Sequence, residues 1–574
     1  MNAATTASQH QQQQQQQFAP HTRTVADLFV ECLVNEGVET MYGIPGEENI
    51  PLMEAIARDG RIRFVLTRHE QGAGFMAATQ GRLTGKPGVC LATLGPGALN
   101  LTLPVAQANT ANTPLVAICA QGNVTRLYKE SHQIIDLVSV FRPLTQWTSM
   151  IVEPASVPEM VRKAFSITQR NRPGATCLIL PEDVADMPAP AEARPLPLPE
   201  RMRFAPTRDT IDRAVRLIRA AKHPIILAGN GVARGDAENE LLALAEQLNV
   251  PVATTFEGKG VISDRMNPLA LGVVGFMRHD YENFAFDEAD LIISVGFSIQ
   301  QFDPKKINPH DDKTIIHINT FSEDTDAHYS TALNIMGDIR ATLEELIAAL
   351  REGNVTFGVS HPRIHELLTH EYESYARDDS FPMKPQRIVA DTRRAMETDT
   401  DIALVDTGAL KMWMARLYPT YYSNTCVIDN SLSTMAWTLP GAVAASLEHP
   451  GRPVLAVMGD GSFMMNVQEI ETAVRVGARI VILVWVDEAY GLIKWKMDLH
   501  DGAHEYVDFN NPDVVALGMS FGAKGHLIES ADELYPTLRA ALRSGSGIDI
   551  IACPVDYSEN MKLIAKLGEV DFSG

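Results

Sequence analysis

The sequence predicts an α/β protein of three doubly wound parallel-sheet domains. Helical patterns alternate with short β-rich runs along three stretches of the chain, which is the pattern of βαβ units around a parallel sheet. The length of 574 residues is also far beyond the size at which one hydrophobic core keeps growing. A composition of 45% hydrophobic and 21% charged residues is typical of a globular chain with substantial cores.

The first α/β region is expected over residues 22–185. Its helical segment TVADLFVECLVNEG is followed by the β-rich runs RFVLTR, GVCLATLGPG, PLVAICA and ATCLILPEDV. Residues 1–21 precede it with a glutamine tract, which has no means of forming a packed core and predicts a disordered tail. Prolines break every periodicity in the stretch ADMPAPAEARPLPLPERMRFAP that follows, which predicts a linker.

Two more α/β regions are expected further along the chain. Residues 206–350 contain the strand candidates HPIILAGNG, PVATTF, ADLIISVGF and KTIIHINT. A charged and poorly periodic connection then covers residues 351–385. Residues 386–574 return to the alternation with DIALVDTG, CVIDN, PVLAVMGDGSF, RIVILVWVDEAYG and IDIIACPVDYS. No short repeat is visible, which excludes a solenoid.

Charge and cysteine usage exclude several classes of protein. A formal net charge of −22 argues against binding nucleic acid, because phosphates are held by clustered Lys and Arg. The six cysteines lie far apart, without the spacing of a zinc site or a disulfide framework, which fits a reducing compartment. No apolar run approaches the ~20 residues that span a bilayer, and the first residues do not form a signal peptide. We therefore predict a cytoplasmic protein without a membrane or nucleic-acid partner.

Two successive predicted strands of the third region each end on a carboxylate. VLAVMGD ends at Asp460 and VILVWVD ends at Asp487. In an open parallel sheet, ligands bind beyond the carboxyl ends of the strands, so neighbouring strands would place these acids side by side. Two such carboxylates repel unless a cation lies between them, and hard oxygen ligands beside a diphosphate suit Mg²⁺. Gly459 and Gly461 would let the backbone approach that phosphate, and Ser462 adds a donor at the helix start.

Simpler interpretations of these residues exist. A lone Gly-Asp-Gly is most often a turn, and Asp487 taken alone is more often a helix cap or part of a solvated loop. The two acids together, 27 residues apart and each directly after a β-rich run, favour a metal and diphosphate site.

MGDGSF and the later VDEA resemble the diphosphate and Mg²⁺ motif of thiamine diphosphate (ThDP) enzymes. TRHEQGAGFMA, LGPGALN, ESHQIID, GFSIQQFDP and CPVDYSEN extend the resemblance to the acetohydroxyacid and acetolactate synthase group over most of the chain, with PVDYSEN and Asp487 more like the catabolic members. The resemblance implies a pyrimidine-binding first domain, a non-catalytic middle domain and a diphosphate-binding third domain. By it, Asp460 and Asp487 are side-chain ligands of Mg²⁺, and the Ala489 carbonyl is a backbone ligand.

The resemblance also implies site residues in the first region. Glu70 is similar to the glutamate that activates the cofactor by proton exchange with its pyrimidine, whereas an isolated HEQ would more often form a surface ion pair. Gly43 and Gly46 resemble the loop over the thiazolium ring. Gln133 resembles a glutamine that faces the reacting carbon. For His132, a substrate-facing role and a structural role at a domain interface are both open.

Further residues of the third region carry over by the same resemblance. Met435 resembles the large apolar residue that bends the cofactor, although an ordinary core Met is the alternative. Thr407 and Gly408 match the turn beneath the diphosphate loosely. Lys496 stands where anabolic synthases carry a Trp that sizes the second-substrate pocket, and Trp495 lies one residue earlier, so a slip of one residue would exchange them. A solvated helix Lys is an equal alternative.

The function that the resemblance implies is acetolactate synthase. Pyruvate would be decarboxylated on ThDP and the two-carbon unit joined to a second 2-oxo acid, in a branched-chain amino acid or acetoin pathway. The alternatives are a ThDP-dependent 2-oxo-acid decarboxylase or a carboligase with another acceptor, and a non-catalytic subunit of the same fold. FAD is possible but not expected, because catabolic members lack it and Gly229 and Gly231 do not complete a dinucleotide fingerprint. A homodimer or homotetramer is expected.

Overall fold

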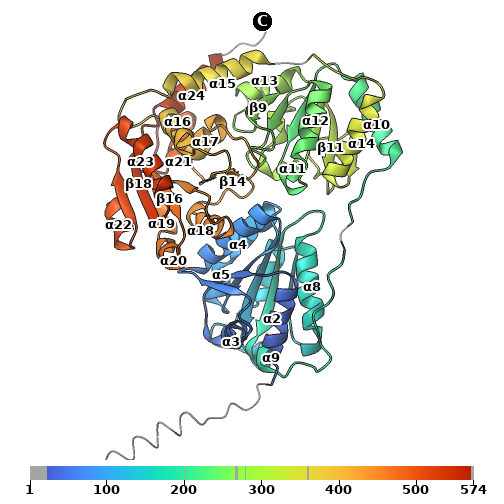
Figure 1. Cartoon of the computed structure of the whole chain (residues 1–574), viewed down its shortest axis with the longest axis vertical. Helices are drawn as coiled ribbons and strands as arrows, with labels where there is room; N and C mark the ends of the chain where they lie inside the picture. Colours follow the sequence, from blue (N-terminus) through green and yellow to red (C-terminus); the bar gives the residue numbers. More distant parts are fainter. Residues whose placement is uncertain (1–21, 201, 266–268, 278–279, 359–360, 570–574) are drawn as a thin grey trace, which may run out of the picture.

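The computed structural model describes residues 22–200, 202–265, 269–277, 280–358 and 361–569. These residues form three α/β domains, each around a six-stranded sheet in which every strand pair is parallel (Figure 1). The predicted fold class is therefore confirmed. The predicted glutamine-rich tail, residues 1–21, lies outside the described residues.

The first domain has the strand order β2-β1-β3-β4-β6-β5. Its strands are β1 (Thr40–Gly43), β2 (Arg63–Leu66), β3 (Gly88–Ala92), β4 (Leu115–Gln121), β5 (Trp147–Met150) and β6 (Ala175–Pro181). Its helices are α2 (Val25–Asn35), α3 (Ile50–Asp59), α4 (Glu70–Thr84), α5 (Pro96–Asn100), α6 (Thr102–Thr110), α7 (Leu137–Phe141), α8 (Val157–Thr168) and α9 (Glu182–Asp186). Every residue of β4 and β6 is buried, as expected for central strands covered on both faces.

The middle domain has the strand order β12-β11-β10-β7-β8-β9. Its strands are β7 (Pro224–Ala228), β8 (Val252–Thr254), β9 (Ala270–Val273), β10 (Leu291–Val295), β11 (Thr314–Asn319) and β12 (Leu333–Met336). Its helices are α10 (Arg208–Ala220), α11 (Gly231–Arg234), α12 (Glu238–Leu248), α13 (Tyr281–Glu288) and α14 (Ile339–Arg351). The proline-rich stretch before α10 contains no helix or strand among its described residues after α9 ends, apart from one isolated bridge to Thr24.

The third domain has the strand order β14-β13-β15-β16-β18-β17. Its strands are β13 (Ile402–Val405), β14 (Cys426–Ile428), β15 (Val454–Gly459), β16 (Ile480–Val486), β17 (Lys524–Leu527) and β18 (Ile548–Pro554). Its helices are α16 (Pro385–Ala395), α17 (Ala409–Leu417), α18 (Thr438–Glu448), α19 (Asp460–Met465), α20 (Glu469–Val476), α21 (Gly491–Asp501), α22 (Val514–Ser520), α23 (Ala531–Arg543) and α24 (Glu559–Glu569).

The connection between the middle and third domains is more ordered than the sequence indicates. Helix α15 (Pro362–Tyr375) lies within residues 351–385, where we expected a poorly periodic connection. It packs against α13 of the middle domain and α16 of the third (Figure 1). Its buried residues include the charged Glu371, which accepts a hydrogen bond from Arg416 at 2.6 Å, so apolar spacing alone does not reveal this helix.

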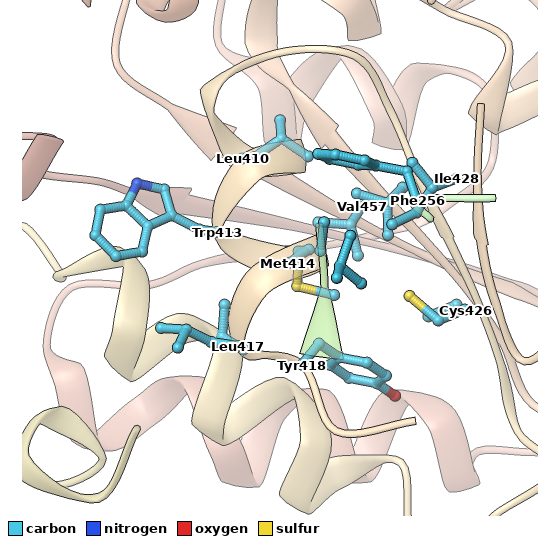
Figure 2. Packing of buried hydrophobic residues seen from close by; sticks show 14 of the residues in the cluster. Phe256, Leu410, Trp413, Met414, Leu417, Tyr418, Cys426, Ile428 and Val457 are labelled. Carbon is cyan, nitrogen blue, oxygen red and sulfur yellow. The ribbon is translucent and has the colours of Figure 1, made fainter. Parts of the chain in front are cut away.

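The third domain packs against both other domains. Helix α4 of the first domain lies along α18 of the third (Figure 1). Figure 2 shows Leu410 and Met414 of α17 and Val457 in one apolar cluster, with Phe256 of the middle domain near Ile428 in the same cluster. The third domain is thus fixed between the other two by continuous apolar cores.

No helix within the described residues combines the length and the apolar character needed to cross a bilayer.

Candidate active site

The carboxylates of the two successive strands lie at neighbouring strand ends, because β15 and β16 are paired. Asp460 begins α19 and is only 1% exposed. Its Oδ1 accepts a hydrogen bond from the Gly461 amide at 2.8 Å, and its Oδ2 accepts from the amides of Asp487 at 3.1 Å and Glu488 at 2.7 Å. The Asn511 side-chain amide donates to the same Oδ2 at 2.8 Å. Asp460 therefore ties the loop after β16 to the end of β15.

Asp487 lies beside Asp460 in a position that disfavours two negative charges. Burial, and then the charge of Asp460, raise the pKa of Asp487 to about 8. A cation between the two groups would remove that repulsion and restore the carboxylate. Gly491 leaves room for the Asp487 carboxylate, because a Cβ at position 491 would lie 2.5 Å from Asp487 Oδ2. Among the described residues, no three or more His, Cys, Asp or Glu side chains cluster as metal ligands, so a bound cation here would need further oxygen ligands from a cofactor or water.

One pocket brings together the residues predicted for the cofactor and metal in the third domain, but not Trp495 or Lys496. It is lined by Thr407, Gly408, Met435, Gly459, Asp460, Gly461, Ser462, Asp487 and Ala489. Thr407 Oγ1 is buried and has no hydrogen-bond partner in this pocket, so it offers a group to a ligand. The Ser462 hydroxyl, at the start of α19, donates to Asp406 at 3.3 Å. The lining and the paired acids fit the diphosphate and divalent cation of ThDP.

Asp406 is a functional residue that sequence reasoning missed. It follows β13, which pairs with β15, so the ends of three adjacent strands carry acids. It is fully buried, accepts hydrogen bonds from the amides of Thr407 at 2.7 Å and Ala436 at 3.0 Å, and burial raises its pKa to about 6. Asp406 thereby holds the turn at Thr407 and the residue after Met435. The run DIALVD carries the same strand-then-Asp signal as the two predicted acids and could have revealed it.

The loop that carries Met435 is held from all three domains. Lys411 of α17 donates to Asn430 Oδ1 at 2.9 Å and Ser433 Oγ at 3.1 Å, and burial lowers its pKa to about 8. Glu257 of the middle domain accepts from the Asn430 amide at 3.2 Å. Thr434 donates to Gln107 of the first domain. Such clamping keeps Met435 at a fixed place in the pocket.

The predicted residues of the first domain form a second cluster. Glu70 begins α4, is 8% exposed, and accepts a hydrogen bond from the Asn100 amide at 2.9 Å. A Cβ at Gly97 would lie 3.0 Å from Glu70 Oε1, so α5 packs directly against this carboxyl. Gly43 ends β1, which pairs with β2 and β3, and Gly46 packs on Thr93 after β3. The cluster lies at the carboxyl end of the first sheet.

Gln133 and His132 are exposed next to this cluster. Gln133 adopts a left-handed backbone with φ of 57°, and its carbonyl lies against Gly95, where a Cβ would come within 2.5 Å. Left-handed backbone at a non-glycine residue marks a position held by its surroundings. The structure does not bury His132 in a domain interface within one chain.

The two clusters do not line the same pocket within one chain. The described residues that line the third-domain pocket all fall between residues 407 and 557, and none belongs to the first domain. Glu70 of the same chain is therefore not part of the lining of this pocket.

Trp495 and Lys496 are now distinguished by their environments. Trp495 is 4% exposed, and its ring lies 5.6 Å from that of Phe276 of the middle domain. Lys496 is exposed on α21, the helix that follows Ala489. Trp495 is thus mostly buried but also lines a second pocket with Asp487 and Gly491, whereas Lys496 is exposed and lines neither pocket.

Comparison with known families matches all three domains. The N-terminal TPP binding domain of thiamine pyrophosphate enzymes matches residues 23–140, their central domain matches residues 211–346, and their C-terminal TPP binding domain matches residues 406–552.

Curated relatives match nearly the whole chain. An acetolactate synthase of Bacillus subtilis is 34% identical over 94% of each chain. A catabolic acetolactate synthase of Raoultella terrigena is 33% identical over 94% of this chain and 97% of its own. A probable acetolactate synthase large subunit of Methanococcus aeolicus is 33% identical over 90% of each chain.

The raised pKa of Asp487 predicts a pH-dependent stability of the metal-free protein. The folded protein keeps a proton on Asp487 that the unfolded chain, with an ordinary carboxyl pKa, has already released. The free energy of unfolding should therefore fall as pH rises from about 4 to about 8, by on the order of a few kcal/mol relative to Asp487→Asn. Thermal unfolding in EDTA across this pH range measures the difference.

The control is Glu488→Gln, which removes the neighbouring exposed carboxylate and should keep the pH dependence of the wild type. Identical pH profiles for the wild type and Asp487→Asn would show that Asp487 is not held next to a second charge.

Proposed function

This chain belongs to the thiamine pyrophosphate enzymes, and we propose that it acts as an acetolactate synthase. The observation that carries the proposal is the similarity to acetolactate synthases over about nine-tenths or more of both chains. The reaction joins two pyruvate anions and one proton into 2-acetolactate and CO₂. The first pyruvate loses its carboxylate as CO₂, and its remaining two-carbon unit forms a bond to the carbonyl carbon of the second.

ThDP with Mg²⁺ is the proposed cofactor, and it supplies the electron sink for loss of CO₂. Asp460, Asp487 and the Ala489 carbonyl would hold the cation. Thr407 and the backbone at Gly461 would contact the diphosphate. The proposal is supported by the pKa of Asp487, which burial and the charge of Asp460 raise, and by the unpartnered Thr407 hydroxyl in the same pocket.

Glu70 is proposed to exchange a proton with the pyrimidine of the cofactor. Its carboxyl is fixed by Asn100 and covered by α5, which holds one proton-accepting group in one place. Gln133 and His132, exposed beside this carboxyl, are proposed to face the substrate.

A second copy of the chain is the proposed partner. The two site clusters do not line the same pocket in one chain, and apolar side chains are exposed near both of them. Leu99 and Leu103 are 45% and 41% exposed after the Gly95 turn, and Met465 and Ile493 are 43% and 46% exposed beside the third-domain pocket. Pairing Glu70 of one chain with Asp460 of another would complete the site and cover these residues, in a homodimer or in a homotetramer. We place the protein in the cytoplasm.

The direct test is to incubate the purified protein with ThDP, Mg²⁺ and pyruvate, and to measure acetoin after acid decarboxylation of the product. Acetoin that depends on both additives supports the proposal. Acetaldehyde instead of acetoin would identify a decarboxylase. Pyruvate left untouched with ThDP bound would point to another 2-oxo acid, and Lys496 would then be the first residue to replace.

Glu70→Gln should lower the rate of pyruvate consumption by about 100-fold or more, because a neutral amide has no proton to exchange. The dissociation constant for ThDP should stay within about threefold, since the diphosphate residues are unchanged. Glu47→Gln, an exposed glutamate of the same domain, is the matched control and should behave as the wild type. Full activity of Glu70→Gln would remove Glu70 from its role.

Two inactive variants should complement each other if the site needs two chains. Glu70→Gln and Asp460→Asn are each expected to be inactive, but a mixed dimer carries one site with both changes and one site with neither. After co-refolding in equal amounts, activity should reach about a quarter of the wild type, as random pairing in a two-fold dimer requires. A mixture as inactive as its components would contradict the shared site.

A further inference from the structure

Glu469 is a buried carboxylate of the third domain that reaches into the first domain. It begins α20 and is 0% exposed. Its Oε1 accepts hydrogen bonds from the backbone amides of Arg68 at 3.1 Å and His69 at 3.0 Å. Its Oε2 accepts from the Thr472 hydroxyl at 2.7 Å. Both oxygens are therefore used, and neither is available to a ligand.

The two amides belong to the turn that places Glu70. Arg68 and His69 are the last residues before α4, and Glu70 is its first residue. His69 caps this helix, because its Nδ1 accepts from the Gln71 amide at 3.1 Å and its carbonyl accepts from the Ala73 amide at 3.2 Å. The backbone amides of Arg68 and His69 take no part in these capping bonds and donate to Glu469 instead. Fixing this turn fixes the direction in which the Glu70 side chain leaves the helix.

The sequence makes space for this contact. A Cβ at position 72 would lie 2.6 Å from Glu469 Oε1, so only glycine lets the carboxylate approach the helix start. Glycine inside a helix is unfavourable by about 1 kcal/mol relative to alanine, so its place at the third residue of α4 has a local steric reason.

We propose that Glu469 is a positioning residue for Glu70, because it accepts hydrogen bonds from the backbone amides of the turn before Glu70. This proposal rests on the proposed role of Glu70 in the reaction. Glu469 does not line the third-domain pocket. Burial raises its pKa to about 7, yet a neutral carboxylic acid still presents a carbonyl oxygen to two N–H donors. The contact therefore depends on an acceptor oxygen and not on the charge.

The segment that carries Glu469 begins close in sequence to Asp460, a proposed metal ligand of the same chain. Asn466 follows α19, its carbonyl accepts from the Glu469 amide at 3.1 Å, and its side chain donates to the Ala436 carbonyl at 2.9 Å. Residues 460–469 thus connect Asp460, the Met435 loop and the Glu70 turn within ten positions of sequence. A displaced α20 would move the Glu70 turn while Asp460 stays at the strand end.

The test compares Glu469→Ala with Glu469→Gln, which keeps the acceptor oxygen. Glu471→Gln, on the same helix, is the matched control, because its amide oxygen keeps an acceptor for Arg475, whose side chain also donates to the Leu66 carbonyl. The first readout needs neither cofactor nor substrate: hydrogen exchange of the amides in residues 66–72, followed by mass spectrometry. The second is the rate at which bound ThDP exchanges its thiazolium C2 proton for deuterium, the step that Glu70 is proposed to promote. ThDP affinity and melting temperature are measured alongside.

Glu469→Ala should speed amide exchange in residues 66–72 and slow C2-proton exchange by about 10-fold to 100-fold, as expected for a displaced catalytic group. ThDP affinity should stay within about threefold, and Glu469→Gln should restore most of the rate. The double variant Glu70→Gln/Glu469→Ala should be no slower than Glu70→Gln, because Glu469 acts through Glu70.

Other outcomes overturn the proposal. A lower melting temperature with unchanged C2-proton exchange per bound ThDP would make Glu469 a domain contact only. A Glu469→Gln variant as slow as Glu469→Ala would show that charge, not an acceptor oxygen, matters. C2-proton exchange is followed without pyruvate, so it is independent of the overall reaction. If the wild-type protein exchanged the C2 proton but formed no acetolactate from pyruvate, the proposed function would be refuted and the role of Glu469 would stand.

Discussion

The site depends on two carboxylates held side by side at the ends of β15 and β16. Their separation is set by the pairing of the strands and by the amides of the following loop, which bind Asp460 and leave it no freedom to turn away. Two buried negative charges at this distance are costly, and the raised pKa of Asp487 expresses that cost. A cation between the two carboxylates would offset this repulsion, which is why we propose that they hold the Mg²⁺ of the cofactor.

Everything else in the site is arranged around this anchor by contacts between domains. Glu257 of the middle domain and Gln107 of the first domain both hold the loop that carries Met435. Glu469, only nine residues beyond Asp460, holds the turn before Glu70. The middle domain, which contributes no residue to the pocket lining among the described residues, thus still fixes the shape of the site. Rigid support of this kind is what holds reacting groups within the small tolerance that catalysis needs.

The fold class could be predicted because buried parallel strands are continuous apolar runs, and nearly every such run became a strand. The strands that sequence reasoning missed, such as β9 and β17, are only four residues long, which is too short to establish a pattern, and β17 is also partly exposed on both faces. The acid pair was predictable from position alone, since strand ends meet at one edge. Asp406 has the same signal at the end of DIALVD but was not singled out.

Long-range contacts were beyond the reach of sequence patterns. Glu469 binds amides about 400 positions away, and nothing in the run NVQEIETAV shows which carboxylate is buried. Likewise, Trp495 could be separated from Lys496 only once Phe276 was seen against its ring. The most direct test of the acid pair is calorimetric titration of ThDP into metal-free protein with and without Mg²⁺. We predict saturable binding that requires Mg²⁺ and is lost in Asp460→Asn; equally tight binding without a divalent cation would contradict it.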